Sequence, residues 1–134
     1  MAQDQAAHLG LDGHPQGLLH GRVQGLFALG GLEEVGRNMM FVEHGNEIII
    51  MDAGLQFTEE ETPGIDYIIP NMSYLKGKEK NVRGVVITHG HYDHIGAIPH
   101  VIPHIGNPTV YALPIAAAIV KKRQTDFPMS QVDV

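Results

Sequence analysis

Residues 88–94 concentrate the side chains of this chain that could bind a metal ion. They include His89, His91, Asp93 and His94. Neutral imidazole nitrogens and carboxylate oxygens are both ligands of zinc. An extended loop can direct His89 and His91 at one ion, because the two alternate across a single residue, and Asp93 and His94 can face a second. Two ions about 3.5–4 Å apart can stabilise both oxygens of a hydrolytic displacement.

The alternative for these residues is a histidine-rich loop that serves packing or chance metal binding. The position of these residues directly after a predicted strand argues against that interpretation. Residues 82–88 are rich in β-branched side chains and predict a strand that leads directly into His89. Active sites of α/β folds lie at the carboxyl ends of strands. We also expect Gly90 to leave the backbone free to bring the two neighbouring histidines together. The sequence therefore favours a metal site.

Other polar residues are candidates for supporting roles. Asp52 ends an apolar predicted strand, from which its carboxylate could orient a ligand histidine or bond within the turn before Gly54. The two roles are compatible. Asn38, after a glycine-rich loop, could point toward the same pocket. His100 and His104 have the i, i+4 spacing of helix-borne zinc pairs, but no glutamate follows the first histidine. We therefore favour structural or solvent-facing roles for that pair.

The elements predicted to position these residues alternate between strands and helices. Strands are predicted at residues 23–29, 39–43, 47–51, 82–88 and 109–113. Helices are predicted at 95–105, at 114–126 starting from Pro114, and briefly near Pro70, with an acidic loop at 56–66. The apolar run at 48–51 predicts that its strand is buried on both faces. The order predicts an α/β fold with helices covering a sheet.

Length and composition indicate one small globular domain. The chain has 134 residues, of which 43% are hydrophobic, and no cysteine, which excludes disulfides and thiolate metal sites. Residues 1–22 lack periodicity and predict a mobile tail before a domain at 23–134. No apolar run approaches the ~20 residues of a membrane span. Without a signal-peptide pattern, we expect a cytoplasmic protein with no membrane contact.

The net charge of −6 argues against a chain-wide basic surface for nucleic acid. It does not exclude an RNA substrate, because a bound metal supplies local positive charge.

Residues 88–94 resemble the HxHxDH signature of the metallo-β-lactamase superfamily. Further segments resemble bacterial ribonuclease J, and these are residues 31–39, 51–57, 64–70 and 94–99. The resemblance extends over about residues 26–127. It implies a metallo-β-lactamase αββα sandwich, of which this chain would be the amino-terminal portion, with a β-CASP domain interrupting the fold later.

The resemblance also implies an activity, namely zinc-dependent hydrolysis of RNA phosphodiesters, both internally and from the 5′ end, in RNA processing and decay. Such an enzyme would act on RNA, including ribosomal RNA, and form homo-oligomers at full length. By motif position His89 and His91 would hold a first zinc ion. Asp93 and His94 would hold a second, with Asp93 beside the attacking hydroxide. Asp52 would match the family's strand-end aspartate.

The sequence departs from the family pattern at two points. Tyr92 stands where many ribonuclease J sequences carry glutamate, which leaves the ligands unaltered. The family's remaining ligands, two histidines and a bridging aspartate, come further along, whereas no histidine follows His104 here. We therefore expect an amino-terminal part of a longer protein, inactive alone. Two alternatives remain, a thioester or lactam hydrolase of the superfamily and a non-catalytic metal-binding fragment.

Overall fold

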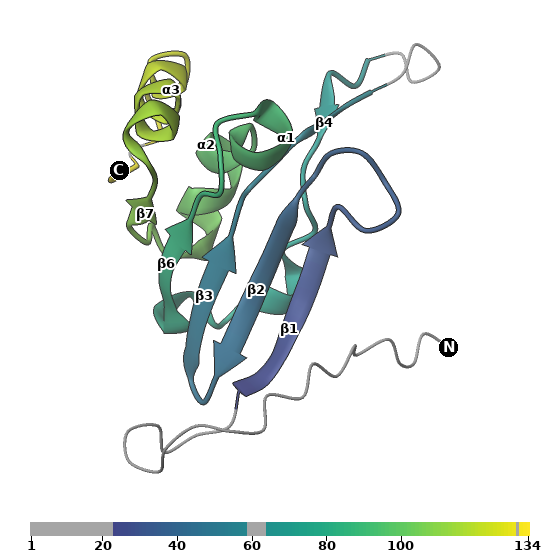
Figure 1. Ribbon diagram of the computed structural model, residues 1–134, viewed down its shortest axis with the longest axis vertical. Coiled ribbons are helices and arrows are strands. Elements are labelled where there is room, and N and C mark those ends of the chain that lie inside the picture. The colour runs from purple at the N-terminus through teal and green to yellow at the C-terminus, as the bar shows by residue number, and fades with distance from the viewer. Residues whose placement is uncertain (1–22, 59–63, 131) are drawn as a thin grey trace.

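A five-stranded mixed sheet forms the centre of the computed structural model, which describes residues 23–58, 64–130 and 132–134. The strands are β1 (Val23–Gly30), β2 (Met39–His44), β3 (Glu47–Met51), β6 (Val82–Val86) and β7 (Val110–Tyr111). Their order in the sheet is β1-β2-β3-β6-β7 (Figure 1). The pairs β1–β2 and β2–β3 are antiparallel, whereas β3–β6 and β6–β7 are parallel. The carboxyl ends of β3, β6 and β7 therefore share one edge of the sheet.

The remaining elements are short, apart from one helix. They are β4 (Gln56–Phe57), β5 (Tyr67–Ile68), α1 (Tyr92–Ile95), α2 (Ile98–Val101), α3 (Pro114–Gln124) and the 3-10 helices η1 (Ser73–Leu75), η2 (Glu79–Asn81) and η3 (Ile102–Ile105). The strand β4 pairs with β5 in a separate two-stranded sheet. In the described part of the chain, no helix has the length and apolar character needed to cross a membrane. The predicted α/β class is confirmed.

The core lies between one face of the sheet and the helical segments. Phe41, Ile50 and Val85 lie side by side on neighbouring strands and are each at most 1% exposed. Apolar side chains of the helical segments pack against this face, and these are Ile95, Ile98, Val101, Ile102, Ile105 and Val120. Removing such a side chain from water stabilises the fold by about 1.5–3 kcal/mol. This layer holds the carboxyl edge of the sheet against α1.

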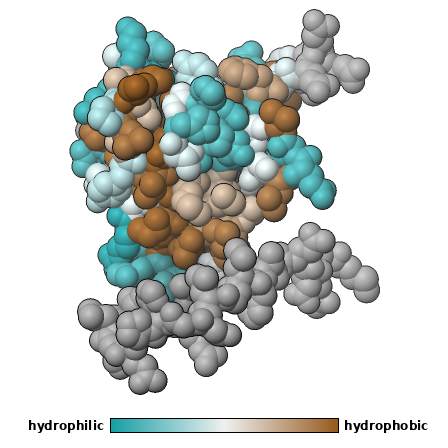
Figure 2. Space-filling view, in the orientation of Figure 1, coloured by the Kyte–Doolittle hydropathy of each residue, from teal (hydrophilic) through white to brown (hydrophobic). Residues whose placement is uncertain are grey.

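The opposite face of the sheet is largely open in the described residues. Leu26, Val42 and Ile49 form a cross-strand row on this face, and Leu26 is 56% and Ile49 40% exposed. Figure 2 shows hydrophobic side chains gathered over the strands. The prediction that the strand at 47–51 is buried on both faces was therefore wrong. Only Ile48 and Ile50 are fully buried, because the helices cover one face.

Two local predictions were wrong for identifiable reasons. The helix predicted at 95–105 begins earlier, at Tyr92, and is divided into α1, α2 and η3. Pro99 and Pro103 each lie within the first two positions of a new segment, where the missing N–H breaks no helical hydrogen bond. The loop predicted at 56–66 begins as the strand β4 instead.

The other helix predictions agree better with the structure. The helix predicted from Pro114 is confirmed and ends at Gln124. The short helix predicted near Pro70 is the 3-10 helix η1, which begins at Ser73. The mobile tail predicted at residues 1–22 lies outside the described residues.

Candidate metal centre

The candidate ligands lie where the chain leaves β6 and enters α1. His89 and His91 belong to the connecting loop, and Asp93 and His94 belong to the single turn of α1. Asp52 directly follows β3, and its backbone N–H donates to the Val86 carbonyl at 3.0 Å. The end of β3 therefore lies beside the end of β6, because the two strands are parallel neighbours. This is the edge of the sheet at which α/β proteins place their sites.

The structure brings the four predicted side chains together. One ligand atom from each of His89, His91 and Asp93 lies within 4.8 Å of the other two. The rings of His89 and His94 have centroids 4.0 Å apart, and His94 Nε2 lies 3.4 Å from Asp93 Oδ2. The Asp93 carboxylate thus neighbours both the histidine pair and His94. The four side chains form one continuous cluster.

This cluster fits a zinc ion in chemistry and in spacing. It offers imidazole nitrogens and a carboxylate, which bind zinc at about 2.0–2.2 Å. Ligand atoms around a tetrahedral ion at that distance lie roughly 3.3–3.6 Å from one another. The separations within 4.8 Å can close to that value by small side-chain rotations. His89 and His91 are exposed, so an ion can reach them from solvent.

The buried Asp52 carboxylate orients the His94 ring through a hydrogen bond. Its carboxylate, in a residue only 5% exposed, accepts a hydrogen bond from His94 Nδ1 at 2.8 Å. It also accepts bonds from the Thr88 backbone N–H and hydroxyl, both at 2.9 Å. A carboxylate only accepts, so Nδ1 is the donor of this bond, and in the neutral ring Nε2 is then the nitrogen that can bind a metal. Nε2 lies next to Asp93.

The backbone of Asp52 is in the left-handed region, with φ 62°. This conformation is uncommon outside glycine, although aspartate tolerates it better than most residues. Here the hydrogen bonds of the carboxylate to Thr88 and His94 hold it in place. The turn aims the Asp52 side chain across to α1.

Backbone hydrogen bonds join the segment after Asp52 to α1 and the following turn. They are Ala53 N to His94 O at 2.8 Å, Leu55 N to Tyr92 O at 3.1 Å and Ala97 N to Ala53 O at 2.9 Å. Between them Gly54 passes so close to α1 that an added Cβ would overlap the backbone carbonyl of Asp93. Glycine is therefore required at this position by close approach. No local pattern around Gly54 indicates that contact.

Gly90 contributes to the loop through its small size. Its φ lies outside the left-handed region, so the loop needs no conformation special to glycine there. An added Cβ would meet the terminal Cδ1 atom of Ile119 at 2.8 Å. The small residue lets the loop approach α3.

Asn38 and Thr88 complete the surroundings of the cluster. Asn38 Nδ2 donates to the Asp93 carbonyl at 3.0 Å and lies 3.3 Å from both Asp93 Oδ2 and His94 Nε2. The structure thus places Asn38 in the pocket toward which it was expected to point. Thr88 was not singled out from the sequence. The one feature of the sequence that could have indicated its role is the position of a hydroxyl residue between the strand and the first histidine.

His100 and His104 lie apart from this cluster. The His100 ring packs between Tyr67 and Phe127, with centroid distances of 5.0 and 4.9 Å. Its Nε2 atom is buried and has no hydrogen-bond partner. Burial, and secondarily the positive charge of Arg123, lower the pKa of His100. His104 is exposed. In the part of the chain that the structure describes, the only group of three or more potential metal ligands is His89, His91 and Asp93.

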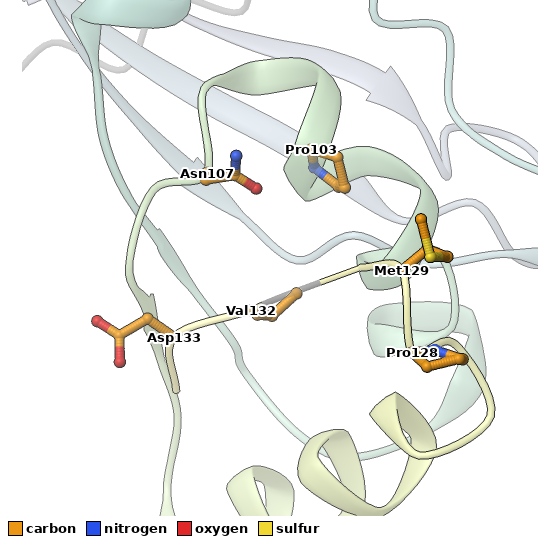
Figure 3. A pocket seen from close by; sticks show the side chains of 6 residues that line it. All are labelled: Pro103, Asn107, Pro128, Met129, Val132 and Asp133. Carbon is orange, nitrogen blue, oxygen red and sulfur yellow. The ribbon is translucent and has the colours of Figure 1, made fainter.

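Two surface hollows differ in their chemistry. One is a groove beside the cluster, to whose wall His91, Tyr92 and Asp93 contribute. The other, shown in Figure 3, lies between η3 and the C-terminal segment, and Asp133 is its one acidic lining residue. The Asp133 carboxylate accepts a hydrogen bond from the Thr109 hydroxyl at 3.2 Å. That second hollow is lined by no histidine, so of these two hollows only the first adjoins the candidate ligands.

Comparison with known proteins agrees with this geometry. The sequence profile of the Metallo-beta-lactamase superfamily matches residues 32–133. Ribonuclease J 1 of Streptococcus pyogenes serotype M3 is 47% identical over 97 residues, which are 72% of this chain and 17% of that protein. Ribonuclease J of Mycoplasma pneumoniae is 44% identical over 98 residues, which are 73% and 17% of the two chains. This chain thus spans about a sixth of the length of these relatives.

Among solved structures, the Rm3 metallo-beta-lactamase superposes with a TM-score of 0.45 at 24% identity, covering 69% of this chain and 34% of that one. The resemblance to ribonuclease J inferred from the sequence segments is confirmed by the two relatives. The superfamily profile matches most of the chain, including every residue of the histidine cluster. The chain belongs to the metallo-β-lactamase superfamily.

Proposed function

We propose that this chain carries metal-binding residues of a zinc-dependent ribonuclease of the ribonuclease J type, which hydrolyses RNA phosphodiesters internally and from the 5′ end. The observation that carries the proposal is the convergence of His89, His91 and Asp93 within 4.8 Å. Relatives named ribonuclease J, at 47% and 44% identity, support RNA as the substrate.

Each residue of the cluster has a distinct role in this proposal. His89, His91, Asp93 and His94 hold the zinc ions. When bound, zinc polarises a phosphoryl oxygen and lowers the pKa of water to near 7. Asp52 accepts a hydrogen bond from His94 Nδ1 and so directs Nε2 toward the cluster.

Two neighbouring residues position this machinery. Asn38 donates to the Asp93 carbonyl at 3.0 Å and so holds the start of α1. Thr88 donates two further hydrogen bonds to the Asp52 carboxylate, from its backbone N–H and its hydroxyl. Partners of this kind tune metal affinity by about 10- to 100-fold.

The test measures the metal content and the substrate preference of the full-length protein, because this chain spans only about a sixth of the length of its relatives and is expected to be inactive alone. Zinc bound after dialysis and cleavage of a 5′-monophosphorylated RNA are compared between the native protein, His91→Ala and His104→Ala. His104 is an exposed histidine outside the cluster, so its variant controls for loss of any imidazole. We expect zinc retention and RNA cleavage to fall only in His91→Ala.

A lactam and a thioester serve as competing substrates in the same assay. Hydrolysis of either one in place of RNA would assign a different reaction of the superfamily. Stoichiometric zinc retained by His91→Ala would contradict the assignment of the metal ligands.

A further inference from the structure

The groove beside the metal-ligand cluster has an aromatic wall. Phe57 of β4 and Tyr92 of α1 line it together with His91 and Asp93. His91 and Asp93 also belong to the cluster. The groove therefore directly adjoins the position of a substrate held at the cluster.

The two rings are exposed and contact each other. Phe57 is 66% and Tyr92 45% exposed. Their centroids are 6.5 Å apart at an interplanar angle of 89°, an edge-to-face contact. The chain on either side is anchored, because Phe57 pairs with Tyr67 and the Leu55 N–H donates to the Tyr92 carbonyl at 3.1 Å. Figure 1 shows β4 and α1 side by side.

The charges around the groove favour a base over a phosphate. Glu34 lines the groove, and its hydrogen bonds from Arg37 and the Gly31 N–H lower its pKa, so it is ionised at neutral pH. The ion pair of Glu34 with Arg37 is neutral as a whole, so this wall offers a phosphate no net positive charge and leaves a neutral ring unopposed. On α3, Arg123 lies with its guanidinium carbon 4.8 Å from the Tyr92 ring centroid and donates to the Gly96 carbonyl at 3.1 Å. This cation–π contact further fixes the ring.

We propose that Phe57 and Tyr92 form a stacking site for the nucleobase of an unpaired RNA nucleotide next to the phosphodiester held at the metal cluster. This inference rests on the proposed function. Every base has a π-face, so the site binds single-stranded RNA with little sequence preference. A base within a duplex is already stacked and paired, and the site therefore discriminates against double-stranded RNA.

The test compares variants of Phe57 in the same full-length protein with zinc bound. Phe57→Leu removes the aromatic face and Phe57→Tyr keeps it. Tyr111→Leu removes another exposed ring, 57% exposed, that does not line the groove. We expect Phe57→Leu to raise KM for single-stranded RNA by roughly 5- to 150-fold, the range for loss of one stacking aromatic. Phe57→Tyr should restore the native KM, and Tyr111→Leu should not change it.

A ligand-side experiment separates stacking from a structural role of the ring. Cleavage-resistant phosphorothioate RNAs carry either 2-aminopurine or an abasic nucleotide at successive positions around the scissile linkage. At one position we expect 2-aminopurine fluorescence to be quenched by the native protein and not by Phe57→Leu. The abasic substitution at that position should weaken binding to the native protein and have little further effect on Phe57→Leu.

The outcomes are distinct for the two proposals. Normal RNA cleavage with an unchanged KM in Phe57→Leu would overturn the stacking site and leave the ribonuclease proposal standing. The stacking site would also be overturned if, at every position, the abasic substitution weakened RNA binding by the same factor in Phe57→Leu as in the native protein. Absence of RNA cleavage by the native zinc-loaded protein would overturn the ribonuclease proposal, and the stacking site with it.

Discussion

The Nδ1 atom of His94 donates to Oδ2 of Asp52 across 2.8 Å, which ties α1 to the end of β3. Asp52→Asn places an amide N–H₂ or a weaker carbonyl acceptor against that nitrogen. Asparagine tolerates the left-handed φ of this position, so the turn should persist. We expect zinc affinity to fall about 10- to 100-fold, measured by competition with a chromophoric chelator. Unchanged affinity would show that Asp52 serves the turn alone.

Gly54 allows the segment after β3 to pass directly under α1. In Gly54→Ala the new Cβ overlaps the Asp93 carbonyl, and the backbone on both sides is hydrogen-bonded. We expect the free energy of unfolding in urea to fall by about 3 kcal/mol or more, because no side-chain rotation relieves this overlap. Gly90→Ala is the matched control. Its Cβ comes too close only to the far end of the flexible Ile119 side chain, and its distances to Ala116 are ordinary contacts. A loss as large as that of Gly54→Ala would refute the argument.

His100 makes the stability of the fold depend on pH. Burial first, and the charge of Arg123 second, lower its pKa in the folded state, whereas the unfolded ring titrates near pH ~6.5. The unfolded state therefore binds more protons below that pH, and stability falls as pH drops through about 6.5 toward the folded pKa. Above about pH 6.5 His100 is neutral in both states, and its titration no longer lowers the stability of the fold.

The measurement is the urea midpoint at pH 7.5 and 5.5, compared between the native chain and His100→Phe. Phenylalanine keeps the contacts with Tyr67 and Phe127 and carries no titrating group. We expect a smaller loss of stability on acidification in the variant. Equal losses in the two proteins would show that other groups cause the pH dependence.

Glu43 is a nearly buried acid whose charge contributes to stability. Its side chain is 8% exposed and accepts hydrogen bonds from Tyr74 at 2.5 Å and Lys78 at 3.0 Å. The Tyr74 bond first, and Lys78 after it, lower the pKa of Glu43. The stabilisation is present above the unfolded pKa of about 4.3 and is lost as pH falls through the lower folded value.

We expect Glu43→Gln to reduce the free energy of unfolding at pH 7 by about 1–3 kcal/mol, because Lys78 and Tyr74 lose a charged acceptor. The matched control is Glu47→Gln. Glu47 also pairs with a cation, Arg83, but its side chain is 60% exposed, so a change of at most about 1 kcal/mol is expected there. Thermal denaturation of the two variants compares them directly. Similar shifts would indicate that burial of Glu43 adds nothing.

The location of the histidine cluster was predictable because its members are adjacent in sequence. A strand that leads directly into His89 specifies the edge of the sheet, and Asp52 at the end of another apolar strand specifies the same edge once the two strands are parallel neighbours. The contacts of Thr88 with Asp52 and of Gly54 with Asp93 were not predictable. They join residues almost forty positions apart, and neither residue type is unusual in its local sequence. The ligand roles themselves remain predictions.

The errors in secondary structure arise where a local pattern fits two structures. The apolar run around Ile49 is the same whether one or both faces of the strand are covered, and only the helix placement decides between them. Pro99 and Pro103 are compatible with a kinked helix and with new segments that begin at each proline. Phe57 pairs with Tyr67 across the residues assigned to a loop, and a two-residue strand has no detectable period.

The hydrogen bonds between Ala53, Leu55 and α1 make the metal cluster and the sheet a single cooperative unit. His94 and Asp93 belong to a helix of one turn, which is too short to persist alone. An ion bound to them therefore stabilises the native state against every opening that separates α1 from the end of β3. The amide protons of Ala53 and Leu55 should then exchange with solvent more slowly as zinc is added, although neither residue is a ligand. The metal would act as a folding ligand of the sheet edge before it acts in any reaction.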